Sequence, residues 1–109
     1  MKPVRGDLVT MVTSGDYGKP RPALVIQDDV FDELPSVTVL SLTSALRSAP
    51  LLRVDVAPGT RTGLRAASQI MIDKPTTIRR EKVGRIIGHV DDDTLMLASR
   101  TLARFLGLL

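Results

Sequence analysis

Short apolar runs alternate with polar breaks along most of this chain, and the breaks are rich in glycine, proline and paired acidic residues. Runs of this kind are typical of consecutive short β-strands. Their ends can be placed because glycine and proline interrupt regular secondary structure. The pattern predicts strands over residues 6–13, 22–27, 36–42, 51–56, 66–70, 76–78 and 86–90, with short turns over 30–34 and 79–83, the second stopped by Gly84.

The C-terminal segment has helical spacing instead. Asp91-Asp92-Asp93 opens it, and a carboxylate cap with an acidic first turn suits the positive end of a helix dipole. Apolar residues then recur on one helical face: Leu95, Ala98, Leu102, Phe105, Leu106 and Leu109. We expect this face to pack on the sheet or on a partner. The fold class predicted is mainly β, a small and partly open barrel with a C-terminal helix.

The length of 109 residues fits a single domain, residues 1–109, with one core. No apolar stretch is long enough to cross a bilayer, and the N-terminus lacks the apolar core of a signal peptide. Cysteine is absent, which excludes a disulfide framework and thiolate chemistry. We therefore expect an intracellular, cytoplasmic protein.

Charge favours an anionic partner. The net charge is +3, the isoelectric point is about 9.8, and eleven of the fifteen basic residues are arginine. Arginine suits bidentate phosphate recognition, so nucleic acid is the first candidate partner. Only three aromatic residues are present, which argues against an extensive platform for stacking bases.

One segment, Pro20-Arg21-Pro22, holds a charged residue on restricted backbone, as a binding or catalytic group requires. Arg21 lies between Pro20 and Pro22, directly before an apolar run. Each proline fixes its own φ and pushes the preceding residue toward an extended conformation, so Arg21 begins a strand on stiffened backbone. A charged binding or catalytic group is mounted in this way. A surface arginine after a turn explains the segment equally well.

Most standard catalytic constellations are missing. The single histidine, His89, cannot support a zinc site without many carboxylates, and no glycine-rich phosphate loop occurs. We expect neither a metal nor a cofactor. Polar residues at predicted loop–strand junctions remain: Asp16, Arg21, Thr43, Ser44, Arg65, Ser68 and Gln69. Each has an ordinary structural explanation alone, and the sequence does not show whether they meet.

Five segments, in order, resemble the MazF/PemK family of toxin endoribonucleases from bacterial toxin–antitoxin pairs. They are Arg5–Val9, Gly18–Ile26, Val39–Ser44, Gly63–Ile70 and Val83–Gly88. The resemblance implies a small SH3-like β-barrel with a C-terminal helix, the toxin fold shared by MazF, PemK and CcdB. It also implies a homodimer with RNA along the dimer groove, and an antitoxin that inserts a flexible, often acidic segment there.

The resemblance also implies metal-independent cleavage of single-stranded RNA, commonly mRNA, at a short sequence. Arg21 and Thr43 match the family's catalytic arginine and threonine, and Asp16 aligns with an acidic residue of its first loop. Arginine stays protonated at neutral pH, so Arg21 would stabilise charge, and Asp16 is the first candidate for the base. Further basic residues are candidate phosphate contacts: Lys19, Arg47, Arg65 and Arg79. Ser44, Ser68 and Gln69 are candidate RNA contacts.

Ser68 departs from the family pattern, because several members carry aspartate there. A serine hydroxyl barely ionises near neutral pH, so it cannot take over proton transfer from a carboxylate, although it can hydrogen-bond a phosphate or a base. Two alternatives stay open. One is a non-catalytic toxin of the same fold that poisons DNA gyrase through its apolar C-terminus, residues 105–109. The other is a nucleic-acid-binding barrel without catalysis.

Overall fold

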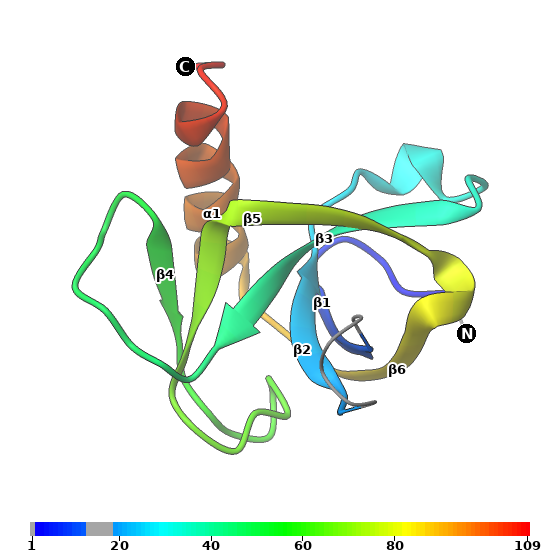
Figure 1. The fold of residues 1–109 in the computed structure, drawn as a ribbon, viewed down its shortest axis with the longest axis horizontal. Helices are drawn as coiled ribbons and strands as arrows, with labels where there is room; N and C mark the ends of the chain where they lie inside the picture. The colour runs from blue at the N-terminus through cyan, green and yellow to red at the C-terminus, as the bar shows by residue number, and fades with distance from the viewer. Residues whose placement is uncertain (1, 13–18) are drawn as a thin grey trace.

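The computed structural model describes residues 2–12 and 19–109. Within these residues, six strands, two 3₁₀ turns and one α-helix follow one another (Figure 1). They are β1 (Asp7–Met11), β2 (Arg21–Val25), η1 (Asp29–Phe31), β3 (Ser36–Thr43), β4 (Arg53–Val56), β5 (Ser68–Arg79), η2 (Arg80–Lys82), β6 (Val83–His89) and α1 (Asp92–Phe105).

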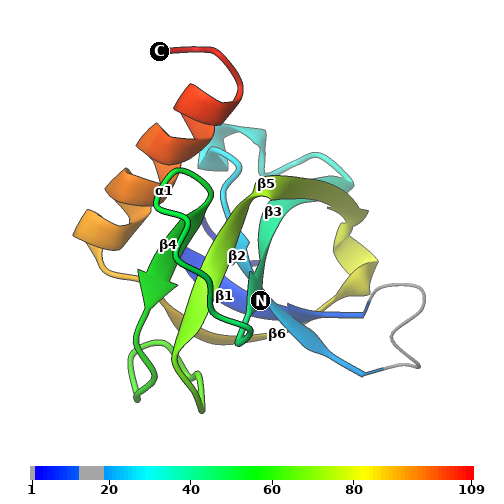
Figure 2. The same cartoon turned by 60° about the vertical axis from the view of Figure 1, so that its left-hand side comes forward.

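The strands form one antiparallel sheet in the order β4-β5-β3-β2-β1-β6. The sheet curls, and η2 leads from the far end of β5 directly into β6 on the opposite edge (Figure 1). The helix α1 lies beside β4 and packs against β4 and β5 (Figure 2). The prediction of a mainly β, barrel-like domain with a C-terminal helix is confirmed.

The central strands are buried on both faces. Adjacent residues of one strand belong to two separate apolar clusters, as Leu8 and Val9 do in β1. One cluster lies under α1 and includes Leu24, Leu40, Ile70, Ile72 and Ala98. The other lies inside the curl of the sheet and consists of Val9, Met11, Ala23, Val25, Val37 and Val39. Burial on both faces explains why β2 contains an unbroken apolar run, Ala23-Leu24-Val25, rather than strict alternation.

The helix begins as predicted. Asp91 is its N-cap, and the Thr94 backbone N–H donates a hydrogen bond to the Asp91 carboxylate (2.8 Å). Hydrogen bonding from the Thr94 side chain, and then from its backbone N–H, lowers the pKa of Asp91. Leu95, Ala98 and Leu102 pack on the core as expected.

Beyond Leu102 the predicted apolar face of α1 is open. The helix ends at Phe105, so Leu106 is its C-cap and Leu109 lies beyond it, although the spacing predicted both on the helical face. Phe105 and Leu106 are 47% and 52% exposed, and Leu109 is 81% exposed. This end of the apolar stripe is therefore largely exposed rather than packed on the sheet.

Two strand predictions are wrong. Residues 66–70 and 76–78 were expected to form separate strands, but β5 runs through Asp73-Lys74-Pro75 without a break. The reason is β3, which pairs with both halves of β5 across a register shift between Leu40 and Leu42. Gly84 also does not precede the last strand, because β6 already begins at Val83, which pairs with Met11 of β1.

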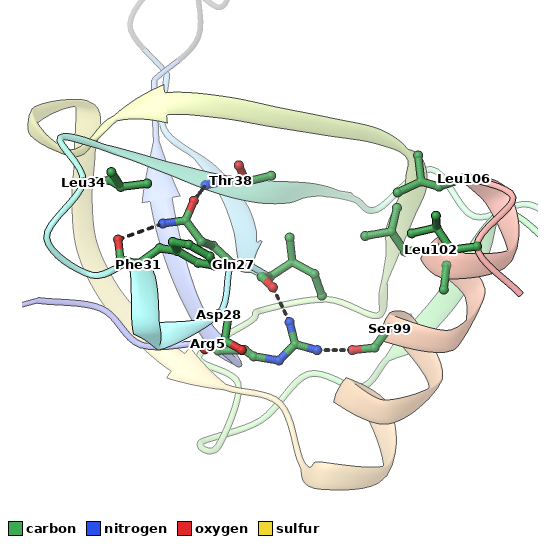
Figure 3. Close-up of a pocket in the computed structure, with 12 residues that line it drawn as sticks. Arg5, Gln27, Asp28, Phe31, Leu34, Thr38, Ser99, Leu102 and Leu106 are labelled. Carbon is green, nitrogen blue, oxygen red and sulfur yellow. Dashed lines mark hydrogen bonds between the residues drawn. The ribbon is translucent and has the colours of Figure 1, made fainter.

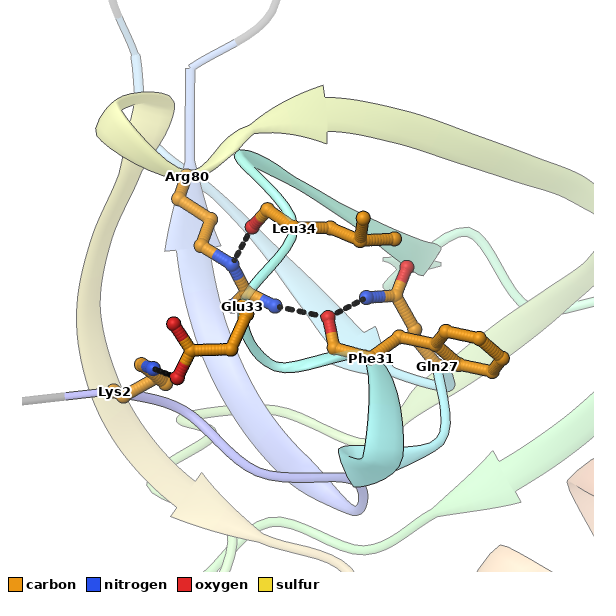
Figure 4. Close-up of polar contacts among 6 residues, drawn as sticks. All are labelled: Lys2, Gln27, Phe31, Glu33, Leu34 and Arg80. Carbon is orange, nitrogen blue, oxygen red and sulfur yellow. Dashed lines mark hydrogen bonds and ion pairs between the residues drawn. The ribbon is translucent and has the colours of Figure 1, made fainter.

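Two arginines fix the connections around the sheet. Arg5 donates to the Ile26 carbonyl and to the Ser99 hydroxyl, which ties the N-terminal segment to α1 (Figure 3). Arg80 Nε donates to the Leu34 carbonyl (2.6 Å), at the end of the predicted turn 30–34 (Figure 4). The turn itself is confirmed as η1 and the residues that follow it.

Along the described residues, no helix is both long and apolar enough to cross a membrane.

Candidate active site

A cavity of about 470 Å³ opens where three neighbouring strands have their ends. Arg21 begins β2, Thr43 ends β3 and Ser68 begins β5. Because β2, β3 and β5 are neighbours and antiparallel, the start of β2, the end of β3 and the start of β5 lie next to one another, at the same end of the strands. The cavity is lined by Met11, Arg21, Pro22, Ser41, Leu42, Thr43, Ser44, Ala45, Ser68 and Met71. The structure thus brings together four of the predicted site residues.

Arg21 supplies the charge of this cavity. Its backbone pairs with Met11 of β1, and its side chain is exposed. Of the described residues that line the cavity, Arg21 alone carries a charge, and the walls beside it include Met11, Leu42 and Met71. A guanidinium next to apolar walls is well placed to bind a phosphate, since fewer water molecules compete there for its N–H groups.

Two hydroxyl groups accompany the arginine. Thr43 is half-buried, and its Oγ1 accepts a hydrogen bond from the Ala45 backbone N–H (3.1 Å). That contact leaves the hydroxyl hydrogen of Thr43 available for an oxygen acceptor. Ser68 is 6% exposed, and its hydroxyl donates to the Ala66 carbonyl (3.0 Å). The Ser68 oxygen can therefore accept a hydrogen bond, while its hydrogen is already used.

The other predicted residues that the structure describes lie outside this cavity. Lys19 is exposed just before β2, and Arg65 is exposed in the segment before β5. Arg47 lines a neighbouring cavity of about 470 Å³ next to Gln69. Arg79, at the far end of β5, forms an ion pair with Glu81 (2.8 Å). Asp16 lies outside the described residues.

Gln69 is adjacent to Ser68 but lies on the opposite face of β5, because consecutive residues of a strand face opposite sides. It is 6% exposed, and its amide is hydrogen-bonded to the backbone of Arg47. The alternation of strand residues was the signal that could have separated Ser68 from Gln69. The same signal could have found Ser41, which lies two residues before Thr43 and lines the same cavity.

A second large cavity, of about 550 Å³, lies between η1 and α1 (Figure 3). Its lining is mainly apolar and includes Phe31, Leu34, Leu102 and Leu106. None of the described residues predicted to act on RNA lines it.

The comparison with known families decides where the chain belongs. The sequence model of the PemK-like, MazF-like toxins of type II toxin–antitoxin systems matches residues 4–106. The chain belongs to this toxin family. It is 44% identical over 105 residues to a protein of Mycolicibacterium smegmatis named probable endoribonuclease MazF, covering 95% of this chain and 96% of that one. It is 27% identical to endoribonuclease EndoA of Bacillus subtilis, covering 96% and 95%.

Solved structures agree on the fold. An endoribonuclease in complex with its cognate antitoxin from a mycobacterial species superposes with a TM-score of 0.81 at 23% identity, covering 98% of this chain and 97% of the other. The Mycobacterium tuberculosis toxin MazF-mt6 superposes with a TM-score of 0.79 at 24% identity, covering 96% and 99%. The toxin fold inferred from the resemblance is thereby confirmed.

Proposed function

We propose that this chain is a toxin endoribonuclease that cleaves single-stranded RNA without a metal ion. The observation that carries the proposal is that Arg21, Thr43 and Ser68 line one cavity at the same end of their neighbouring strands. Family membership supports it, as do the two relatives that are named endoribonucleases.

In the proposed reaction, the ribose 2′-oxygen adjacent to the cleaved bond attacks the phosphorus. A bond from the 2′-oxygen to phosphorus forms, and the bond from phosphorus to the 5′-oxygen breaks. The products are a 2′,3′-cyclic phosphate and a 5′-hydroxyl end, and the leaving oxygen takes up a proton. Negative charge gathers on the phosphoryl oxygens in the transition state, which is where a fixed cation and hydrogen-bond donors act most strongly.

Arg21 stabilises that charge with its planar set of N–H donors, and Thr43 donates one further hydrogen bond. Arg21 can also donate a proton to the leaving oxygen, but an arginine side chain stays protonated at neutral pH and does not serve as the base. The base we propose is Asp16. Ser68 accepts a hydrogen bond from the RNA at the buried end of the cavity.

The RNA extends beyond this cavity over neighbouring basic and polar side chains. We propose Lys19, Ser44, Arg47 and Arg65 as contacts, all of them exposed and near the ends of the strands that form the cavity. Phosphate contacts of this kind set affinity and salt dependence, whereas contacts to base edges select the sequence. Cleavage of mRNA requires the protein to act in the cytoplasm.

The partners we propose are a cognate antitoxin and a second copy of this chain. A solved relative is an endoribonuclease bound to its antitoxin, and a basic toxin suits an acidic partner segment. At and beyond the end of α1, four exposed apolar residues form the kind of surface that marks an interface: Phe105, Leu106, Leu108 and Leu109. Sedimentation equilibrium of the free toxin should give the mass of a dimer, and a monomer at micromolar concentration would contradict this.

The test of the function is cleavage of a long single-stranded RNA in excess EDTA by the wild-type protein and by Arg21→Ala. We expect discrete cuts with 5′-hydroxyl ends, and a rate lower by about 10²–10³ in the variant, because it lacks the charge-stabilising group. Near-full activity of Arg21→Ala would remove Arg21 from the site. Inhibition of DNA supercoiling without RNA cleavage would favour the gyrase alternative.

A further inference from the structure

The buried side chain of Gln69 forms the centre of a partly buried polar cluster, on the face of β5 opposite to the candidate active site. Its amide oxygen accepts hydrogen bonds from the Arg47 backbone N–H (3.0 Å) and from Arg53 Nη1 (3.1 Å). Its amide nitrogen donates to the Arg47 carbonyl (2.9 Å) and to Oδ1 of Asp55 (2.9 Å). Gln69 therefore pairs with Arg47 through both backbone groups, much as a neighbouring strand would.

These four contacts use the whole hydrogen-bonding capacity of the side chain. A primary amide has two hydrogens to donate and two lone pairs to accept with, and all four are engaged within the protein. An RNA base could bind Gln69 only by breaking one of these contacts in a site that is 6% exposed. Leaving a buried polar group unpaired in this way is unfavourable.

The segment held by the cluster is the connection between β3 and β4. Arg53 Nη1 also donates to the Ala45 carbonyl (3.1 Å), so side chains from β4 and β5 fix this connection at both Ala45 and Arg47. The connection starts immediately after Thr43 and carries Ser44, which lines the candidate active site. Its geometry therefore decides where Ser44 and Arg47 present themselves to a ligand in the cavity.

We propose that Gln69 is a positioning residue which, together with Arg53 and Asp55, holds the segment after Thr43 so that Ser44 and Arg47 meet the RNA. The inference rests on the proposed function of the site, and it assigns Gln69 to the loop rather than to direct RNA contact. Binding groups on a connection must be held by a surrounding shell of contacts, because a loop alone does not fix them. Loss of Gln69 should weaken RNA binding and sequence discrimination more than the chemical step at Arg21.

The first experiment does not depend on activity. Amide hydrogen exchange is measured by NMR on the ¹⁵N-labelled wild-type protein, on Gln69→Ala and on Thr77→Val. Thr77→Val is the matched control, because it also removes a side-chain hydrogen bond made by β5, the one to Thr38 of β3 (2.7 Å), at the other end of the strand. We expect the Arg47 amide to exchange at least about tenfold faster in Gln69→Ala and at the wild-type rate in Thr77→Val.

A rescue pair separates a specific contact from general loosening. Gln69→Glu keeps the acceptor for Arg47 and Arg53 but loses both donors and places a second carboxylate beside Asp55. Adding Asp55→Asn supplies an amide that donates to the new carboxylate and removes the repulsion. The double variant should regain part of the protection of the Arg47 amide that Gln69→Glu loses.

The second experiment uses steady-state cleavage of RNA and a map of its cut sites. In Gln69→Ala we expect KM to rise about tenfold, kcat to change less than about threefold, and cuts to spread to related sequences. The Thr77→Val control should keep the wild-type KM and cut sites.

Three results would overturn the inference. They are an Arg47 amide still protected in Gln69→Ala, a loss confined to kcat, and unchanged KM and cut sites despite free exchange at Arg47. Weaker RNA binding with full protection of Arg47 would instead assign Gln69 to direct RNA contact. If the wild-type protein cleaves no RNA, the proposed function fails, while the exchange data still report whether Gln69 holds the segment.

Discussion

At the scale of single residues, the candidate site depends on a few polar groups placed among apolar ones. Among the described residues that line the cavity, Arg21 carries the charge. Thr43 is a neutral donor, and its oxygen already accepts a hydrogen bond from the Ala45 N–H. That contact holds the Thr43 oxygen in place, so the hydroxyl needs little reorganisation when charge develops on a phosphate oxygen. Catalysis should therefore respond to Thr43 through its hydroxyl and not through its shape.

Thr43→Val tests this, because valine keeps the shape of threonine and removes the hydroxyl. We expect kcat for RNA cleavage to fall by about tenfold to a hundredfold, less than for Arg21→Ala, since a neutral donor is weaker than a charged one. Thr38→Val is the control on the same strand, with its hydroxyl bonded to Thr77 and far from the cavity. Equal losses in both variants would mean that the effect comes from the strand and not from the hydroxyl.

At the scale of elements, tight backbone packing positions the segment that leads into β5. Gly63 has φ of +71°, and a Cβ added there would lie 2.0 Å from the Ile87 carbonyl oxygen of β6. The Arg61 carbonyl also accepts a hydrogen bond from the His89 N–H (2.9 Å). The segment before Ser68 is thus held against β6 by backbone contacts.

A pair of glycine variants isolates this packing. Gly107 also has a positive φ, +76°, but a Cβ there meets nothing within 4 Å. Gly107→Ala should cost only the strain of the left-handed conformation, about 1–2 kcal/mol of unfolding free energy. Gly63→Ala should cost about 1–3 kcal/mol more, because the new methyl group collides with backbone. Urea denaturation measures both changes in unfolding free energy. Equal decreases in the two variants would show that β6 moves to accommodate the Gly63→Ala methyl group at no cost in stability.

At the scale of the whole molecule, the curled sheet gathers strand ends from distant parts of the chain. Arg21, Thr43 and Ser68 are far apart in sequence but lie at the same end of neighbouring strands, because β2, β3 and β5 are adjacent in the sheet. Basic residues from the segments next to these strand ends, among them Arg47 and Arg65, are exposed. The protein as a whole carries a net charge of +3, which favours long-range attraction of RNA.

Salt dependence tests how these charges are used. With an RNA made resistant to cleavage by 2′-O-methylation, the logarithm of the binding constant should fall linearly with the logarithm of salt concentration. Arg47→Ala and Arg65→Ala should each reduce that slope by about one. Arg100→Ala, on the exposed side of α1, should leave it unchanged. Slopes that do not differ among the three variants would exclude Arg47 and Arg65 as phosphate contacts.

The sequence by itself determined the elements with strong local signals. The apolar runs placed β1 to β4, the aspartate cap placed the start of α1, and the order of segments identified the family. The proline–arginine–proline segment marked Arg21 as the start of a strand. These features are local, since they follow from residue spacing, backbone restriction and capping within a few positions.

The tertiary structure alone decided what depends on partners distant in sequence. Pairing with β3 carried β5 through Pro75, against the local breaking signal. The pleat of β5 sent Ser68 into the cavity and turned Gln69 toward Arg47, Arg53 and Asp55, although the two residues are adjacent. The physical reason is that the register of β5, and the hydrogen-bond partners of Gln69, come from strands and connections distant in sequence. Composition and residue spacing do not contain that information.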